Sequence, residues 1–404
     1  MKQFTVTLAG VLLLLSCNKE NPEDLFFDET FPAGFTYLSE EIYEIVGVAN
    51  TLSNGIAIYG YGNTTRSRLL EYDTMLTEIS DFAVTSNLEG SGMKGTLDGG
   101  LLIYGRDDTW SEDKDEGLLI RLDAAHQEVW EREYGTADYD AVSSCLHLST
   151  GGYVLLLETK VGVEPLAPTT LQVLQIDESG FVENQISVDF GNNTGGGDLL
   201  EAADGGFVAL FNSKAVNALS ASLHVVKFKP DLTEEWTLSL DQNSAGGSGS
   251  RLIAGSDGGY LILCSSTDPM LSLPNAQDLQ LTKLSASGQL EWQESYGIMD
   301  NYDYGKAVVA TSDGGYLVQG FITNGSPNAD NGGLLVLKVD VTGNVLWKKR
   351  YGDQNNYSHL PRGIIAIDND QFILAGNSID LNTDLEDRYK PWILKIDADG
   401  IPIN

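Results

Sequence analysis

Tyrosine, aspartate and asparagine side chains gather in three similar segments of this sequence. The segments are "YGTADYDAV" from Tyr134, "YGIMDNYDYGKAV" from Tyr296 and "YGDQNNYSHLPRG" from Tyr351. Tyrosine faces pack against the C–H patches of sugar rings, carboxylates and amides bond the hydroxyl groups, and tyrosines also anchor protein partners. These residue types therefore favour noncovalent recognition of a glycan or a protein. The candidate binding residues are Trp110, Tyr139, Tyr302, Asp303, Tyr304, Asn356 and Tyr357.

A structural interpretation of the same segments stays open. The repeated Tyr-Gly pair is also typical of a packing element at the end of a strand, and the acids beside it are common turn formers. Trp110 differs, because it stands in the acid-rich segment "DDTWSEDKDEG", where we expect an exposed aromatic side chain.

Residues suited to covalent chemistry form no recognisable site. The four histidines, at positions 126, 147, 224 and 359, lack the spacing of metal ligands. The 58 acidic residues create many accidental carboxylate pairs, so a carbohydrate-active enzyme that uses such a pair remains an alternative. Asp380, Asn382 and Asp384 imitate part of a calcium loop, but its central glycine and closing glutamate are missing. We expect no cofactor, with weak calcium association as the alternative.

The charge balance argues against one class of partner. The chain has 24 basic and 58 acidic residues and a formal net charge of −34. A protein that binds nucleic acid needs a basic footprint for the phosphates, so we expect no nucleic-acid partner. An acidic surface of this kind is typical of a well-solvated exterior.

The N-terminus predicts export and a lipid anchor. "MKQFTVTLAGVLLLLSC" combines a basic residue, a short apolar run and small Ser16, which is typical of a signal peptide over residues 1–16. The letters "LLSC" resemble the bacterial lipobox, which implies a lipidated Cys17, a flexible tether over 17–33 and stable anchoring in the outer membrane. The side of that membrane stays open. We expect Cys145 and Cys264 to be buried free thiols.

One phrase recurs along the rest of the chain. "TSDGGYLVQG" from Thr311 has counterparts in "SDGGYLILCS", "AADGGFVALF", "LSTGGYVLLL" and "TLDGGLLIYG", and weaker copies begin at Thr51 and Ala366. The repeat positions Gly99, Gly151, Gly205, Gly258, Gly314 and Asp370 are 52, 54, 53, 56 and 56 residues apart. A period of this length, repeated seven times, indicates a repeat architecture rather than two or three unrelated domains.

Each repeat reads as four short β segments. In the sixth, "KAVVATS" and "YLVQGFI" flank Asp313 and Gly314, which favours a two-residue hairpin. "GLLVLKVD" and "NVLWKKRYG" flank a tight turn that ends at Gly343. The second hairpin recurs with tryptophan at equivalent places, namely Trp130, Trp236, Trp292 and Trp347, whereas Asn184 replaces it in the third repeat.

Seven four-stranded antiparallel units predict an all-β, seven-bladed propeller over residues 34–404, because a single blade cannot bury both of its faces. A ring of eight or nine repeats and an open solenoid are the rival layouts. The last repeat ends without its tryptophan, and "GFTYLSEE" from Gly34 is a spare β segment, so we expect this segment to pair with the last repeat and close the ring. The variable connections should share one face, where binding residues are expected.

These motifs carry a family resemblance. "VLKVDVTGNVLWKKRYG" and "DGGYLVQG" resemble the secreted propeller lipoproteins of Bacteroidota and, more distantly, the PQQ-like propeller repeat, over about residues 44–404. The resemblance implies the fold and export, and it says little about function. It does not imply PQQ, because the adjacent cysteine pair typical of quinoprotein dehydrogenases is missing. The sequence therefore predicts a non-catalytic binding or scaffolding propeller for a glycan or envelope protein, with a carbohydrate-active enzyme and a structural envelope subunit as alternatives.

Overall fold

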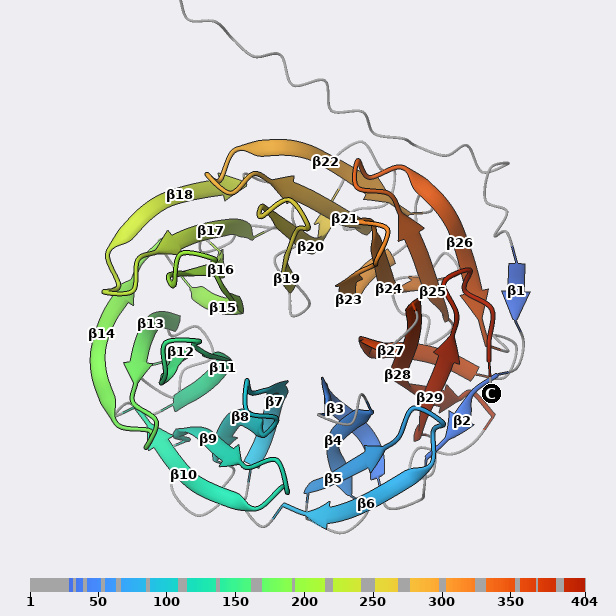
Figure 1. Cartoon of the computed structure of the whole chain (residues 1–404), viewed down its shortest axis with the longest axis horizontal. Coiled ribbons are helices and arrows are strands. Elements are labelled where there is room, and N and C mark those ends of the chain that lie inside the picture. Colours follow the sequence, from blue (N-terminus) through green and yellow to red (C-terminus); the bar gives the residue numbers. More distant parts are fainter. Residues whose placement is uncertain are drawn as a thin grey trace, which may run out of the picture.

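The described part of the chain folds into seven β-sheets arranged as a ring (Figure 1). This computed structural model describes residues 29–31, 34–38, 42–51, 55–62, 67–84, 88–107, 115–135, 139–160, 169–190, 193–214, 221–240, 251–267, 277–297, 303–323, 332–352, 357–367, 370–382 and 389–403. The sequence prediction of a seven-bladed, all-β propeller is confirmed. Within these ranges no helix is long and apolar enough to cross a membrane.

The strands follow one another outward from the centre in every blade. Blades 1 to 3 contain β3 (Ile42–Asn50), β4 (Ile56–Gly62), β5 (Ser67–Tyr72) and β6 (Glu78–Ala83); β7 (Leu88–Gly95), β8 (Leu101–Asp107), β9 (Gly117–Leu122) and β10 (Glu128–Tyr134); and β11 (Tyr139–His147), β12 (Tyr153–Lys160), β13 (Thr169–Ile176) and β14 (Val182–Val188). Blades 4 and 5 contain β15 (Thr194–Glu201), β16 (Phe207–Ser213), β17 (Ser222–Phe228) and β18 (Glu234–Leu240); and β19 (Arg251–Ala254), β20 (Tyr260–Thr267), β21 (Gln277–Leu284) and β22 (Leu290–Tyr296). Blades 6 and 7 contain β23 (Asp303–Ala310), β24 (Tyr316–Thr323), β25 (Gly332–Val339) and β26 (Val345–Tyr351); and β27 (Tyr357–Ile367), β28 (Gln371–Asp380) and β29 (Tyr389–Ile396).

The N-terminal segment supplies the missing outer strand of blade 7. Strand β2 (Thr36–Tyr37) pairs antiparallel with β29, and the Leu38 amide donates to the Pro391 carbonyl at 3.0 Å. This pairing confirms that the spare segment closes the ring. Strand β1 (Glu29–Phe31), inside the stretch expected to be a tether, pairs parallel with β26 and gives blade 6 a fifth strand.

Seven hydrophobic clusters fill the spaces between adjacent blades, including the space between blades 7 and 1. Strand β24 shows how one strand serves two clusters. Tyr316 and Val318 pack toward blade 5, whereas Leu317 between them packs toward blade 7. Because successive side chains point to opposite faces of a sheet, both faces of the strand are buried. This explains why the strands read as continuous apolar runs.

The "DGG" phrase forms a turn that is longer than expected. The Thr311 amide donates to the Gly315 carbonyl at 2.9 Å, and the Gly314 amide donates to the Thr311 carbonyl at 3.0 Å. Within this turn only Gly314 has a positive φ, of 84°. A two-residue hairpin of the type that Asp-Gly favours needs two such residues, and Asp313 is not one. The connection is therefore a four-residue turn followed by a glycine bulge.

The repeated tryptophan and tyrosine link three pairs of neighbouring blades. The Trp292 indole donates to the Val341 carbonyl at 3.1 Å, and the Tyr296 hydroxyl donates to the Gly343 carbonyl at 2.6 Å, both in blade 6. Trp130 with Tyr134, and Trp347 with Tyr351, repeat this contact on blades 3 and 7. The packing interpretation of the Tyr-Gly pair is thus confirmed for these three tyrosines.

Candidate functional site

The two faces of the ring differ in how regular their connections are. The turn face carries the connections from first to second and from third to fourth strand, and the loop face carries all the others. On the turn face, five-residue connections recur, for example at 96–100, 311–315 and 340–344. On the loop face, the connections run from four residues at 84–87 to ten at 241–250. Only the loop face therefore differs substantially from blade to blade.

Ion pairs between a buried lysine and an exposed aspartate fix the turn face. In blade 6, Asp313 of the "DGG" turn accepts from the Lys338 ammonium at 2.7 Å, and this bond holds the pKa of the Asp313 carboxyl at about 2. Asp257 with Lys283 and Asp204 with Lys227 repeat the pair in blades 5 and 4. In blades 4, 5 and 6 the aspartate of the repeat is therefore a structural residue, tied to a lysine of the third strand.

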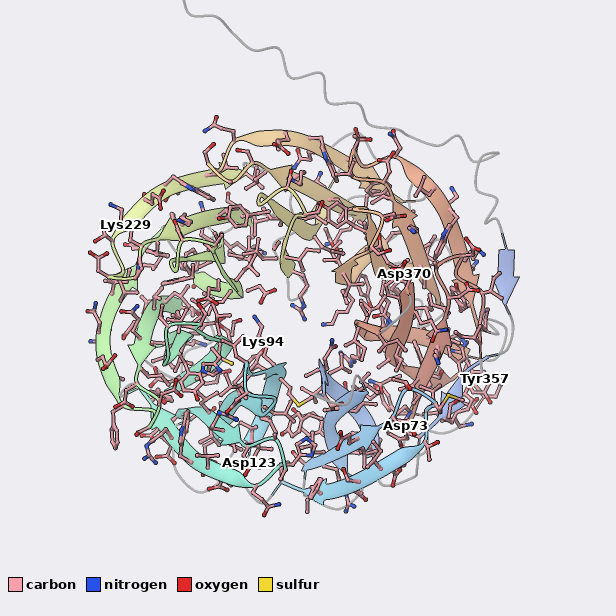
Figure 2. The ribbon with its side chains drawn as sticks, in the orientation of Figure 1. Asp73, Lys94, Asp123, Lys229, Tyr357 and Asp370 are labelled. Atoms are coloured by element: carbon pink, nitrogen blue, oxygen red, sulfur yellow. The ribbon has the colours of Figure 1, made fainter. Side chains whose placement is uncertain are left out.

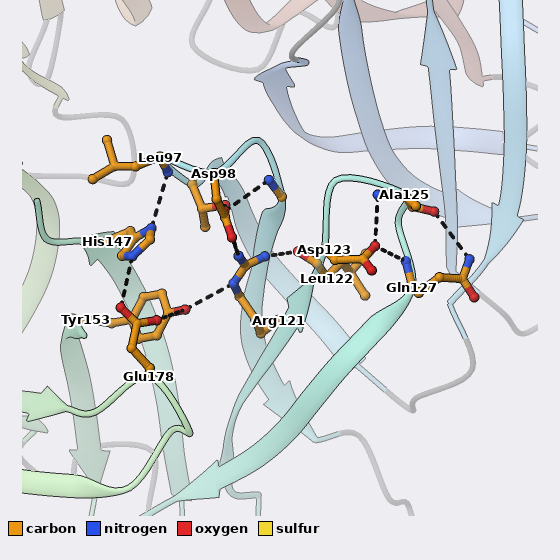
Figure 3. A network of polar contacts seen from close by, with 12 residues as sticks. Leu97, Asp98, Arg121, Leu122, Asp123, Ala125, Gln127, His147, Tyr153 and Glu178 are labelled. Carbon is orange, nitrogen blue, oxygen red and sulfur yellow. Dashed lines mark hydrogen bonds and ion pairs between the residues drawn. The ribbon is translucent and has the colours of Figure 1, made fainter. Parts of the chain in front are cut away.

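Blade 2 makes the same pair with arginine and extends it into blade 3 (Figure 3). Arg121 donates to Asp98 at 2.6 Å and to the Tyr153 hydroxyl at 3.0 Å. Tyr153 donates to Glu178 at 3.0 Å, and Glu178 lies 3.4 Å from His147. Each of these groups has a protein partner, so this network links blade 2 to blade 3.

The loop-face residues expected to bind a ligand are spread over separate blades. Tyr139 begins β11 in blade 3, where the Arg106 guanidinium lies 5.0 Å from its ring centroid. Asp303 begins β23 in blade 6, is fully buried and accepts from the Thr323 amide at 3.2 Å. Its neighbour Tyr304 packs 5.2 Å from the Phe321 ring, and burial raises the pKa of Tyr304 to about 12.

Tyr357 lies in blade 7, toward the outer rim of the ring (Figure 2). The Lys390 ammonium sits 5.1 Å from its ring centroid and also bonds Asp380 at 3.2 Å. Trp110, Tyr302 and Asn356 lie outside the described residues. Tyr139, the Asp303–Tyr304 pair and Tyr357 are thus not brought into one site, and a binding role for any of them stays a prediction.

Charged side chains instead meet at the centre of the ring. Lys94 of β7 reaches from blade 2 to blade 4, where its ammonium donates to Asp198 at 2.6 Å (Figure 2). Asp198 also accepts from the Leu252 amide of blade 5 at 3.0 Å. Burial opposes the charge of Asp198, but Lys94 and Arg251 outweigh it and hold the pKa of this carboxyl below its ordinary value. A cavity of about 410 Å³ opens beside Lys94, between the innermost strands of blades 1, 2 and 7.

Three more cations lie on consecutive innermost strands, and we call them the axial cluster: Arg251 of β19, Lys306 of β23 and Arg362 of β27. Lys306 and Arg362 each occupy an extra residue where the strand register shifts against its neighbour. Such a bulge re-aims the side chain that it carries. Burial and repulsion from Arg251 and Arg362 together lower the pKa of the Lys306 ammonium to about 7.

The remaining titratable groups give no competing site. Within the described ranges, no group of three or more histidine, cysteine, aspartate or glutamate side chains is placed to hold a metal ion. Cys145 and Cys264 are buried and free, as expected. Glu133 shares a hydrogen bond with Glu116, which raises the pKa of Glu133, but this carboxylate pair lies on the outer strand of blade 2.

The sequence contained a signal for the axial cluster that motif analysis missed. The fifth, sixth and seventh repeats place a cation just before their first apolar run, in "RLIAGS", "KAVVATS" and "RGIIAID". The chain has only 24 basic residues, so these three are notable: Lys306 and Arg362 stand at the same place in their repeats, and Arg251 stands one residue later in its own. The motifs were defined by residues that all repeats share. A cation that is present in only three repeats therefore did not stand out.

The comparisons with known proteins support the fold alone. No protein-family model and no curated protein matches this chain. The chain is similar to the solved structure of a streptogramin B lyase, with 10% identity, a TM-score of 0.56 and coverage of 89% of this chain and 96% of that one. It is similar to an ulvan lyase of polysaccharide lyase family PL25, with 9% identity, a TM-score of 0.56 and coverage of 91% and 95%. It is also similar to a puromycin hydrolase, with 12% identity, a TM-score of 0.56 and coverage of 93% and 56%. Enzymes of different activities share this architecture, so the likeness carries no activity over.

Proposed function

We propose that this chain is an exported binding protein. A lipid on Cys17 anchors it in the outer membrane, and the propeller holds a glycan or an envelope protein on its loop face without covalent chemistry. The observation that carries the proposal is the contrast between the two faces. The turn face is fixed by repeated turns and ion pairs, whereas all the substantial variation in connection length lies on the loop face. Variable connections on a rigid scaffold are where proteins place binding residues.

Two other functions are outcomes of the same test. A carbohydrate-active enzyme needs a carboxylate pair beside the substrate. Glu116 and Glu133 pair at the outer edge of blade 2, whereas Asp204 with Glu235, and Asp257 with Glu291, each share a lysine, so these pairs give the alternative no support. A structural envelope subunit would bind other proteins of an assembly and no glycan.

The test uses the mature chain from residue 17 with Cys17→Ser, which removes the lipid acceptor. We expect this chain to retain ligands on a glycan array or to capture an envelope protein, with no turnover of any polysaccharide. Tyr357→Ala should weaken that binding. The matched control is Tyr153→Phe, which alters only the turn face and should leave binding unchanged. Turnover that one Asp or Glu substitution abolishes would replace the proposal with the enzyme alternative.

A further inference from the structure

We propose that Arg251, Lys306 and Arg362 form a binding site for a compact oxyanion at the centre of the ring. The ligand class is a carboxylate, sulfate or phosphate group, either free or at the end of a saccharide. This inference rests on the proposed binding function and names the chemistry of its ligand.

Lys306 provides the first observation. Its ammonium has no hydrogen-bond or ion-pair partner among the described residues, although its side chain is partly buried and faces two arginines. An unpaired buried charge costs several kcal/mol, so proteins normally pair such a group with a counter-charge. The carboxylates in blade 6 do not serve here, because Asp303 accepts from Thr323 and Asp313 pairs with Lys338.

Arg362 provides a second observation. One of its terminal nitrogens bonds Glu44 of blade 1. Its Nε atom is buried and finds no hydrogen-bond partner within the described part of the chain. A guanidinium presents donors in a planar fork that fits an oxyanion, so an unused donor in that fork is suited to one.

The charge balance at the axis leaves a surplus. Lys94 pairs with Asp198 and Arg362 pairs with Glu44, whereas Lys306 pairs with no carboxylate among the described residues. Other acids of the innermost strands are engaged elsewhere: Glu89 with Arg106, Glu201 with Ser149 and Asp303 with Thr323. One unpaired cation beside two arginines suits a single compact anion.

The rest of the molecule restricts the size of the ligand. The chain carries a net charge of −34, so its exterior repels a long polyanion. A single compact oxyanion is repelled much less than a long polyanion. Once it reaches the axis, the positive charges of the axial cluster attract it. Arg251, Lys306 and Arg362 are each only partly buried, so a solute can reach them.

Calorimetric titration with sodium sulfate tests the proposal, using the mature chain with Cys17→Ser and sodium chloride at equal ionic strength as the reference. We expect saturable sulfate binding, weakened at least about tenfold in Lys306→Met because a charged hydrogen bond is lost. Lys338→Met is the matched control, since it removes a buried lysine of the same blade that already has a partner, and it should bind sulfate as the parent does.

A second titration distinguishes the two sources of the oxyanion. Binding of glucuronate but not glucose, lost in Lys306→Met and accompanied by no sulfate binding, supports a group carried on a saccharide. Sulfate binding supports a free anion. If neither ligand binds, or if Lys306→Met binds either one as tightly as the parent, the proposal is wrong. Glycan or envelope-protein binding that survives in Lys306→Met would leave the proposed function standing while this inference fails.

Discussion

Replacing Lys306 by methionine should stabilise the fold, and the gain should depend on pH. Burial and two neighbouring arginines lower the pKa of this lysine from its ordinary value of 10.5 to about 7. At about 1.36 kcal/mol per pH unit, that change sets an upper limit of roughly 5 kcal/mol on the cost of the charge. Lys306 is partly exposed, so solvent screening lowers the cost, and we expect a gain of about 2 kcal/mol in Lys306→Met.

The pH dependence follows from where the proton is bound. Below pH 7 the lysine is charged in both the folded and the unfolded chain, so the parent protein bears the full cost. Between about pH 7 and 10.5 only the unfolded chain keeps the proton, so the stability of the parent rises with pH. The advantage of Lys306→Met should therefore be largest at pH 6 and should shrink toward pH 10.

Urea unfolding at pH 6 and pH 9.5, in chloride buffer without sulfate or phosphate, measures both effects. Lys338→Met is the matched control, because it removes an ion-paired lysine from the same blade and should lose about 1 kcal/mol. A Lys306→Met protein that is less stable than the parent at pH 6, or whose difference from the parent does not change with pH, would refute the reasoning.

Three further predictions concern the blade contacts, the thiols and the anchor. Gly343 and Gly258 both have positive φ, but only at Gly343 would a new Cβ lie 3.0 Å from Trp292, so Gly343→Ala should lose about 2 kcal/mol in urea unfolding and Gly258→Ala about 1. Equal losses would contradict the close packing of Gly343 against Trp292. Burial raises the pKa of Cys145 and Cys264 to about 12, so neither should react with Ellman's reagent until the chain unfolds; rapid labelling of the folded chain would count against their burial. Cys17→Ser should abolish fatty-acid labelling and move the chain from the membrane to the soluble fraction, and labelling that persists would rule out this anchor.

The sequence predicted the ring because the ring depends on features that every repeat shares. The period, the "DGG" turns and the apolar strands are local signals, and "GFTYLSEE" stood out because no repeat contained it. The Asp313–Lys338 pair was not predicted, since 25 residues separate two side chains that only the blade brings together. In the sequence, Asp313 was assigned to a turn and Lys338 to a strand, so neither residue by itself indicated the ion pair.

The axial cluster was beyond motif analysis for a different physical reason. A bulge on each of two strands and the closure of seven blades place the side chains of Arg251, Lys306 and Arg362 near one another. Other repeats have Ser143 or Val46 at the place of Lys306, so the feature belongs to one side of the ring. By contrast, Tyr296 and Tyr351 of the repeated Tyr-Gly pair are packing residues, as one interpretation of the sequence predicted.

Anomalous diffraction from crystals soaked in low-millimolar selenate tests the central claim most directly, because it locates a sulfate-like anion within the ring. We expect a selenium peak at the axis, within hydrogen-bond distance of Lys306 and both arginines, and no such peak in crystals of Lys306→Met. An axis without a peak in the parent protein, or the same peak in both proteins, would contradict the account.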